Sequence, residues 1–162
     1  MEMTLFEQFM QDVPPSGHPF AHRVNALLEQ NSCAFALKAA ASGPVASYND
    51  PWTKKVLINF VFRSKRLHLR VYADHASQDA ALMAVMPKDM AEKMLKSPIC
   101  RRLHDPMKCN ARCPKGYTFT LRGDQIMKCR YSCFLLEVTE PREDYLMQLI
   151  ERELNGRQPQ AM

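Results

Sequence analysis

The sequence predicts an α+β domain with a mostly antiparallel sheet, built from two hairpins, and with helices packed on one face. Two observations support this prediction. Apolar residues recur at helical spacing near both ends of the chain and in its middle, and two pairs of segments between these helical stretches show alternating apolar and polar residues. A chain of 162 residues with a hydrophobic share of 46% can build one core. We therefore expect a single domain over 1–162, with helices and the first hairpin over 1–98, a cysteine loop and the second hairpin over 99–138, and the last helix over 139–155.

Two helices are expected near the N-terminus. Residues 3–13 carry apolar side chains at helical spacing, and Pro14 and Pro15 end that helix. The same spacing returns over residues 20–31. The pattern is weaker over residues 33–50, where it favours no more than a short strand ahead of the first hairpin.

The first hairpin covers residues 56–72. Apolar residues alternate over 56–62 and again over 67–71, and the polar run 63–66 turns the chain between them. The return strand places three side chains on the face opposite the apolar ones: His68, Arg70 and Tyr72. Such a row is typical of the solvated side of a sheet, and a ligand-binding face is the alternative interpretation.

The second half of the chain repeats the mixture of helices and strands. Two helical pieces are expected over residues 80–86 and 87–97, because Pro87 interrupts the periodic pattern. A second hairpin is expected where residues 117–121 alternate and a strand-like run covers 126–138.

The last predicted helix has signals at both ends. Thr139 can cap its start, with acidic residues in the first turn. Asn155 and Gly156 should stop it, because both tolerate the left-handed conformation that often ends a helix.

Five of the six cysteines fall between Cys100 and Cys133. Thiolates bind soft or borderline metal ions, so this clustering indicates a metal site. Cys109 and Cys113 are four residues apart, a spacing that puts both sulfurs on one side of a helical turn. The predicted ligands are Cys109, Cys113 and Cys129, with Cys100 or His104 as the fourth.

Cys133 is kept outside this set on geometric grounds. If Cys129 and Cys133 lay in one extended strand, their separation would be ~13 Å. Sulfurs bound to one tetrahedral zinc lie roughly 4 Å apart. Both therefore bind the same ion only if the strand is bulged or ends between them, and the sequence leaves that open.

Zinc in a structural role is the expected metal, because tetrahedral zinc is commonly held by cysteine thiolates. An iron–sulfur cluster is less favoured, because Gly116 occupies the position at which the third cysteine of a cluster-binding run would fall. No recognised catalytic motif is present, so no catalytic residue is assigned and enzymatic activity stays an open question.

Positive charge is concentrated in the same region. Residues 95–130 hold nine basic residues against two aspartates, whereas the whole chain carries a formal charge of +5. This surplus indicates either a surface for an anionic ligand, a protein partner or nucleic acid, or an offset for the negative charge of clustered thiolates. The candidate anion-binding residues are Arg101, Arg112, Lys115 and Arg130.

Three segments, Phe60–Tyr72, Cys109–Tyr117 and Lys128–Phe134, resemble small uncharacterised bacterial proteins with similar cysteine-bearing C-terminal hairpins. The two helices leading to the first hairpin resemble the YdhG-like group of α+β domains. The first resemblance covers about half of the chain. Both imply a fold, and neither implies an activity.

The sequence thus predicts a metal-binding domain with a binding or regulatory role toward an anionic ligand or partner. A thiol redox or sensor protein that uses Cys109 and Cys113 is the first alternative, and a nucleic-acid-binding module is the second. The acidic residues near the N-terminus argue against a secretory signal, and no segment reaches the ~20 apolar residues that cross a bilayer. We therefore expect a cytoplasmic protein without a membrane partner.

Overall fold

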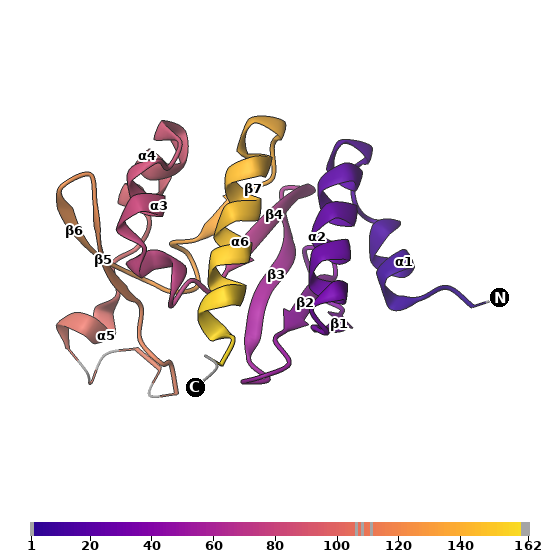
Figure 1. The fold of residues 1–162 in the computed structure, drawn as a ribbon, viewed down its shortest axis with the longest axis horizontal. Helices are drawn as coiled ribbons and strands as arrows, with labels where there is room; N and C mark the ends of the chain where they lie inside the picture. Colours follow the sequence, from indigo (N-terminus) through magenta and orange to yellow (C-terminus); the bar gives the residue numbers. More distant parts are fainter. Residues whose placement is uncertain (1, 106, 108, 111, 160–162) are drawn as a thin grey trace.

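An antiparallel five-stranded sheet, in the order β1-β2-β3-β4-β7, forms the centre of the fold (Figure 1). A separate two-stranded sheet pairs β5 with β6. This confirms the predicted α+β class, in a computed structural model that describes residues 2–105, 107, 109–110 and 112–159. The strands are β1 Ala34–Lys38, β2 Val45–Asn49, β3 Val56–Arg63, β4 Arg66–Val71, β5 Tyr117–Leu121, β6 Asp124–Lys128 and β7 Leu135–Glu137.

Helices precede, interrupt and follow these strands. They are α1 Leu5–Met10, α2 His18–Gln30, α3 Ala80–Ala84, α4 Lys88–Lys96, α5 Arg101–His104 and α6 Glu143–Arg157, with short 3-10 turns η1 Pro15–Gly17, η2 Ala76–Gln78 and η3 Glu140–Arg142. Helices α2 and α6 lie over the same side of the five-stranded sheet (Figure 1).

Helix α1 is shorter than the periodic pattern over 3–13 predicts. It begins after Thr4 because a capping box fixes that end: the Glu7 N–H donates to the Thr4 hydroxyl at 3.1 Å, and the Thr4 N–H donates to the Glu7 carboxylate at 3.1 Å. It ends at Met10, and buried Val13 belongs to the turn that follows.

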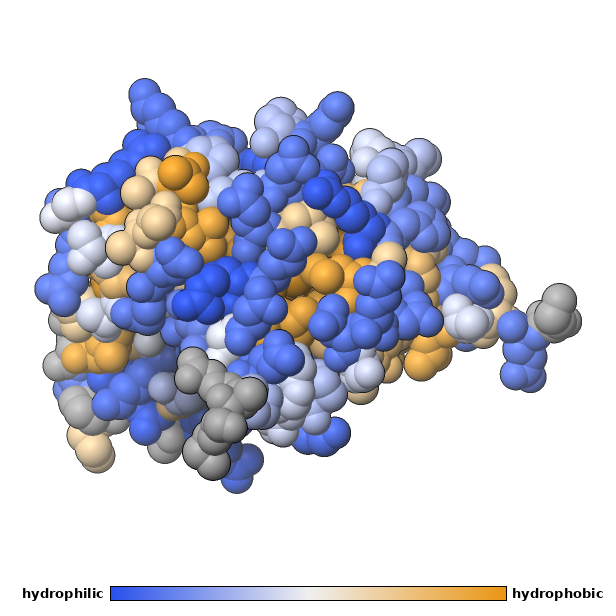
Figure 2. All heavy atoms as spheres, viewed as in Figure 1, coloured by the Kyte–Doolittle hydropathy of each residue, from blue (hydrophilic) through white to orange (hydrophobic). Residues whose placement is uncertain are grey.

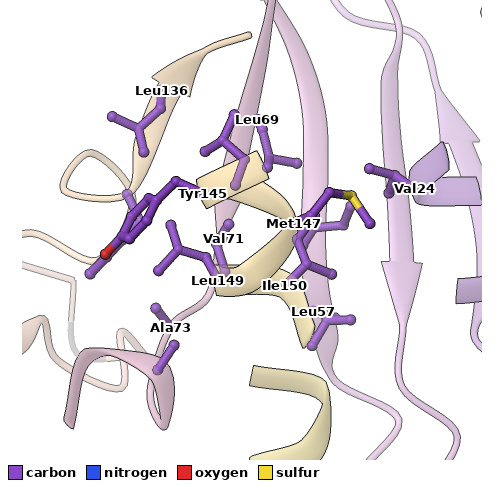
Figure 3. Packing of buried hydrophobic residues seen from close by; sticks show 14 of the residues in the cluster. Val24, Leu57, Leu69, Val71, Ala73, Leu136, Tyr145, Met147, Leu149 and Ile150 are labelled. Atoms are coloured by element: carbon purple, nitrogen blue, oxygen red, sulfur yellow. The ribbon is translucent and has the colours of Figure 1, made fainter. Parts of the chain in front are cut away.

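The main core lies between α6 and the sheet (Figure 3). Leu149 and Ile150 of α6 are fully buried there, beside Leu57 of β3. A register shift makes Leu57 the extra residue of a β-bulge, so the alternation of the strand is interrupted and the adjacent Ile58 is fully buried as well.

Two residues of the row predicted on the other face of the hairpin, Arg70 and Tyr72, are joined by hydrogen bonds to Asn59. Arg70 Nη1 and the Tyr72 hydroxyl donate to Asn59 Oδ1 at 3.2 and 3.0 Å. Arg70 Nε donates to the Tyr131 carbonyl at 2.8 Å. This face is thereby connected to the turn that follows β6, which carries part of the cysteine cluster.

The strand-like run 126–138 is not one strand, so that part of the second predicted hairpin was wrong. Strand β6 ends at Lys128, and the chain turns at Cys129, whose carbonyl accepts from the Cys133 N–H at 2.9 Å. Strand β7 then pairs with β4 instead of with β5. The break lets Phe134 enter the core, where its ring lies 5.6 Å from that of Phe119.

Helix α6 runs through Asn155 and Gly156 to Arg157, so the expected stop was also wrong. Gly156 is required by close packing, because a Cβ atom there would lie 2.5 Å from the Cβ of His75. Thr139 precedes η3 and makes no side-chain capping hydrogen bond.

The last turn of α6 is held by a buried ionic network. Arg157 donates to Glu153 at 2.9 Å and to Asp50 at 3.1 Å, and both carboxylates are fully or almost fully buried. Arg157 also donates to the Tyr72 carbonyl at 3.0 Å. Helix α6 is therefore fixed to the ends of β2 and β4 by charge as well as by apolar contacts.

On the face seen in Figure 2, hydrophilic residues cover most of the surface and hydrophobic ones show between them. Within the ranges that the structure describes, no helix combines the length and the apolar character needed to span a bilayer.

Candidate thiolate site

One cavity of about 470 Å³ is lined by four of the five clustered cysteines. Three segments build its wall: the residues that lead into α5, the loop between α5 and β5, and the turn after β6. The cysteines on the wall are Cys100, Cys109, Cys113 and Cys129, and the cationic residues are Arg101, Arg112 and Arg130.

Cys100 is the most buried of the four, with an exposed fraction of 6%. Its backbone N–H donates to the Met127 carbonyl at 3.0 Å, and the preceding Ile99 pairs with Lys128, so this segment is fastened beside β6. The backbone N–H of Gly116 points at the cysteine and donates to its sulfur at 3.2 Å.

Gly116 is confined by this contact. A Cβ atom at position 116 would lie 2.1 Å from the Lys128 carbonyl oxygen and 3.0 Å from the sulfur of Cys100. The sulfur of Cys100 therefore occupies the space that a side chain at position 116 would enter. Gly116 occupies the position at which a third cysteine would follow Cys109 and Cys113. In the fold, Cys100 places its sulfur beside that position from another part of the chain.

Cys109 and Cys113 do not share a helical turn, which corrects the sequence-based expectation. Cys109 has a positive φ of 80°, which no helix accommodates, and α5 ends at His104. The loop is shaped instead by a turn in which the Cys113 N–H donates to the Asn110 carbonyl at 3.0 Å. The Arg102 guanidinium donates to the carbonyls of Asn110 and Cys113, which ties the loop to α5.

Cys129 reaches the cavity from the turn after β6. Its N–H donates to the Pro98 carbonyl at 2.9 Å, so it is fixed against the segment that carries Cys100. It is half-buried, whereas Cys109 is exposed. The exposure of the four cysteines thus increases from buried Cys100, through half-buried Cys113 and Cys129, to exposed Cys109.

Arg130 is held in the wall by an ion pair, a backbone hydrogen bond and two aromatic rings. Its guanidinium makes a two-point ion pair with Asp74, at 3.1 and 3.0 Å, and lies 5.7 and 5.3 Å from the ring centroids of Tyr72 and Tyr117. It also donates to the Lys115 carbonyl at 3.0 Å. Sequence reasoning missed Asp74, because no spacing rule relates two residues so far apart in the chain.

Arg101 and Arg112 are the cationic groups left to balance the cysteines. Among the described residues, neither side chain forms an ion pair, whereas Arg130 is already neutralised by Asp74. Tyr131 completes this side of the cavity, and burial, followed by the negative charge of a Cys113 thiolate, raises the pKa of its phenol.

The remaining candidates lie outside the cavity. Lys115 does not line the cavity, and its backbone carbonyl accepts a hydrogen bond from Arg130. Cys133 is buried in the core with an exposed fraction of 1%, and burial raises the pKa of its thiol to about 12. The side chain of His104 falls outside the described residues.

The described histidines, cysteines and carboxylates include no group of three placed to hold a single metal ion. The four cysteines therefore surround a space without converging on a point. No protein-family model, curated protein or solved structure matches the chain.

Proposed function

We propose that this protein binds metal through the cysteines of the cavity, and that the bound metal has a structural role. The observation that carries the proposal is that Cys100, Cys109, Cys113 and Cys129 come from three separate segments and line one cavity. A metal bound there would join these segments, and its binding energy would add to the stability of the fold.

The surroundings of the sulfurs suit metal ligands. The Gly116 N–H already donates to the sulfur of Cys100 at 3.2 Å, and hydrogen bonds of this kind orient the ligands of a metal. Four thiolates around a divalent ion leave two negative charges in excess. Arg101 and Arg112 supply two positive charges on the same wall, so the local charge would balance.

Zinc is the single ion that such ligands favour most readily. Its sulfurs must lie within roughly 4 Å of one another. The loop that carries Cys109 and Cys113 would therefore have to close toward Cys100 on binding. All six cysteines are free thiols, which fits a protein of a reducing compartment such as the cytoplasm.

The arginines also support a binding role toward an anionic ligand or partner. Arg101 and Arg112 line the same cavity as Tyr131, whose exposed fraction is 43%. Cationic groups with an accessible aromatic ring suit a phosphate or carboxylate ligand, and nucleic acid is one such partner. Fluorescence titration with a single-stranded oligonucleotide at low and high salt tests the nucleic-acid case, which requires a steep loss of affinity with salt.

Metal analysis of protein purified without added metal tests the main proposal. We expect metal to copurify with the wild-type chain, and to be lost from Cys100→Ser and Cys129→Ser. The matched control is Cys33→Ser, because Cys33 lies beside Tyr48, away from the cavity. Wild-type protein free of metal, or metal retained equally by all three variants, would contradict the proposal.

A thiol redox pair formed by Cys109 and Cys113 is the competing function. It is favoured by the exposure of Cys109 and by the turn that brings the chain back at Cys113. Protein that carries no metal but forms a 109–113 disulfide under mild oxidation, detected by mass spectrometry of peptides, would support this alternative.

A further inference from the structure

We infer that the group held in this cavity is an iron–sulfur cluster, with Cys100, Cys109, Cys113 and Cys129 as its ligands. The inference rests on the proposed metal-binding function and names the group that is bound. It replaces the expectation of zinc, which depended on the spacing of cysteines along the chain alone.

The size of the cavity is the first argument. One zinc ion needs its sulfurs within roughly 4 Å of each other, and the described cysteines form no such group. They line a space of about 470 Å³ instead. A cluster of several iron and sulfide ions fits in such a space and joins cysteine sulfurs that are farther apart than those around one ion. Binding a cluster therefore requires a smaller movement of the loop that carries Cys109 and Cys113 than binding one zinc ion does.

The position of Cys100 is the second argument. The sequence disfavoured a cluster because Gly116 replaces the third cysteine of the run that begins with Cys109 and Cys113. In the fold, the sulfur of Cys100 lies 3.0 Å from where the Cβ of residue 116 would be. The missing ligand is thus supplied from another segment. Gly116 adds its N–H as a hydrogen bond to that sulfur at 3.2 Å, a contact typical of cluster environments.

Cys129, as the fourth ligand, limits what a cluster in this cavity could do. Cys129 is fixed on the same wall by the hydrogen bond from its N–H to the Pro98 carbonyl. A cluster with four cysteine ligands has no iron left open to bind a substrate. The cavity therefore suits a structural or redox-sensing cluster. Arg101 and Arg112 would offset its negative charge, and exposed Cys109 gives oxidants access from one side.

Anaerobic reconstitution tests the inference on the full chain. Reduced protein is incubated with a mixture of ferric and ferrous iron and with sulfide, so that the ferric iron of the cluster is supplied directly and no further oxidant is needed. It is then desalted and analysed for iron, acid-labile sulfide, visible absorption and the electron paramagnetic resonance signal after one-electron reduction by dithionite. We expect iron and sulfide in equal amounts, between about two and about four of each per chain. Cys100→Ser and Cys129→Ser should fall to background, while Cys33→Ser should match the wild type.

Other outcomes separate the two proposals. About one zinc or iron per chain without sulfide, lost in Cys100→Ser and Cys129→Ser, would overturn the cluster and leave the metal-binding function standing. Neither metal nor sulfide bound would overturn both. A full cluster in folded Cys100→Ser, with folding verified by circular dichroism, would overturn the assignment of Cys100 and with it the argument from Gly116.

Discussion

Gly116 lies so close to Cys100 that a Cβ atom at position 116 would be 2.8 Å from the Cβ of Cys100. The same atom would lie 2.1 Å from the Lys128 carbonyl oxygen, and backbone cannot move aside as a flexible side chain can. The contact therefore makes residue 116 a position where only glycine fits, and a first prediction follows from it.

Gly116→Ala should destabilise the protein by ~1–3 kcal/mol, the usual cost of overpacking, and should weaken the proposed metal binding by displacing Cys100. Urea unfolding and metal content measure the two effects. Gly123→Ala is the control: nothing lies within 4 Å of its added Cβ, and only its positive φ of 86° opposes the change. That strain costs about 1 kcal/mol and should leave the bound metal unchanged. Metal binding that falls equally in both variants would contradict the prediction.

The thiols should differ widely in reactivity. Burial raises the pKa of Cys133 to about 12, so at pH 8 only on the order of one molecule in ten thousand carries the reactive thiolate there. Cys109 is exposed. In metal-free protein, iodoacetamide should modify Cys109 first and Cys133 last, as followed by mass spectrometry of peptides over time. Urea should abolish the difference. Equal rates in the folded protein would show that Cys133 is not buried as described.

Arg130 should be sensitive to a change that keeps its charge. Lysine cannot reproduce the two-point pair with Asp74 or the stacking over Tyr72 and Tyr117. We expect Arg130→Lys to cost ~1–2 kcal/mol in the free energy of unfolding. Because Asp74 is half-exposed, its coupling to Arg130 in a double-mutant cycle should be only about 1 kcal/mol. Exposed Arg122→Lys is the control and should change stability little.

The buried carboxylate of Glu153 should be among the most sensitive positions outside the cavity. It accepts from the backbone N–H groups of His75 and Ala76, at 2.8 and 2.9 Å, and from Arg157. Removing it leaves Arg157 without a partner on that side, so Glu153→Ala should cost ~3–5 kcal/mol. Glu151→Ala, on the exposed side of the same helix, should stay within about 0.5 kcal/mol. A loss below about 1 kcal/mol for Glu153→Ala, measured by urea unfolding, would rule out the network as a major source of stability.

Asp50 should contribute to sensitivity to acid. Burial raises the pKa of its carboxyl, but hydrogen bonds from Thr53 and Arg157 outweigh that effect and hold the pKa below its usual range. A native pKa below the unfolded value gives stability that is present above about pH 4 and is lost as the pH falls further. Asp50→Asn should therefore be less stable than the wild type at pH 7 and lose less on acidification to pH 3. Exposed Asp12→Asn is the control and should follow the wild-type profile.

Local pattern was sufficient where an element buries mainly one face. The spacing of apolar residues predicted α2, α4, the body of α6 and strand β4, since one-sided burial leaves its period in the sequence. Strand β3 was also predicted, although both of its faces are buried. Pattern failed where contacts distant in the chain decide the outcome. The run 126–138 looks like one strand, but Phe134 is drawn into the main core and the chain breaks at Cys129. Gly156 looks like a helix stop, but Arg157 is held by Asp50 and α6 continues.

The sequence by itself determined the α+β class, the cysteine-rich region and the surplus of positive charge around it, because composition and periodicity are local properties. Only the tertiary structure decided which cysteines share a cavity. It placed the sulfur of Cys100 beside Gly116, moved Cys133 into the core and paired Arg130 with Asp74. The physical reason is that β6 brings Cys129 and the segment of Cys100 together through backbone hydrogen bonds, and no spacing along the chain encodes pairing between such distant segments.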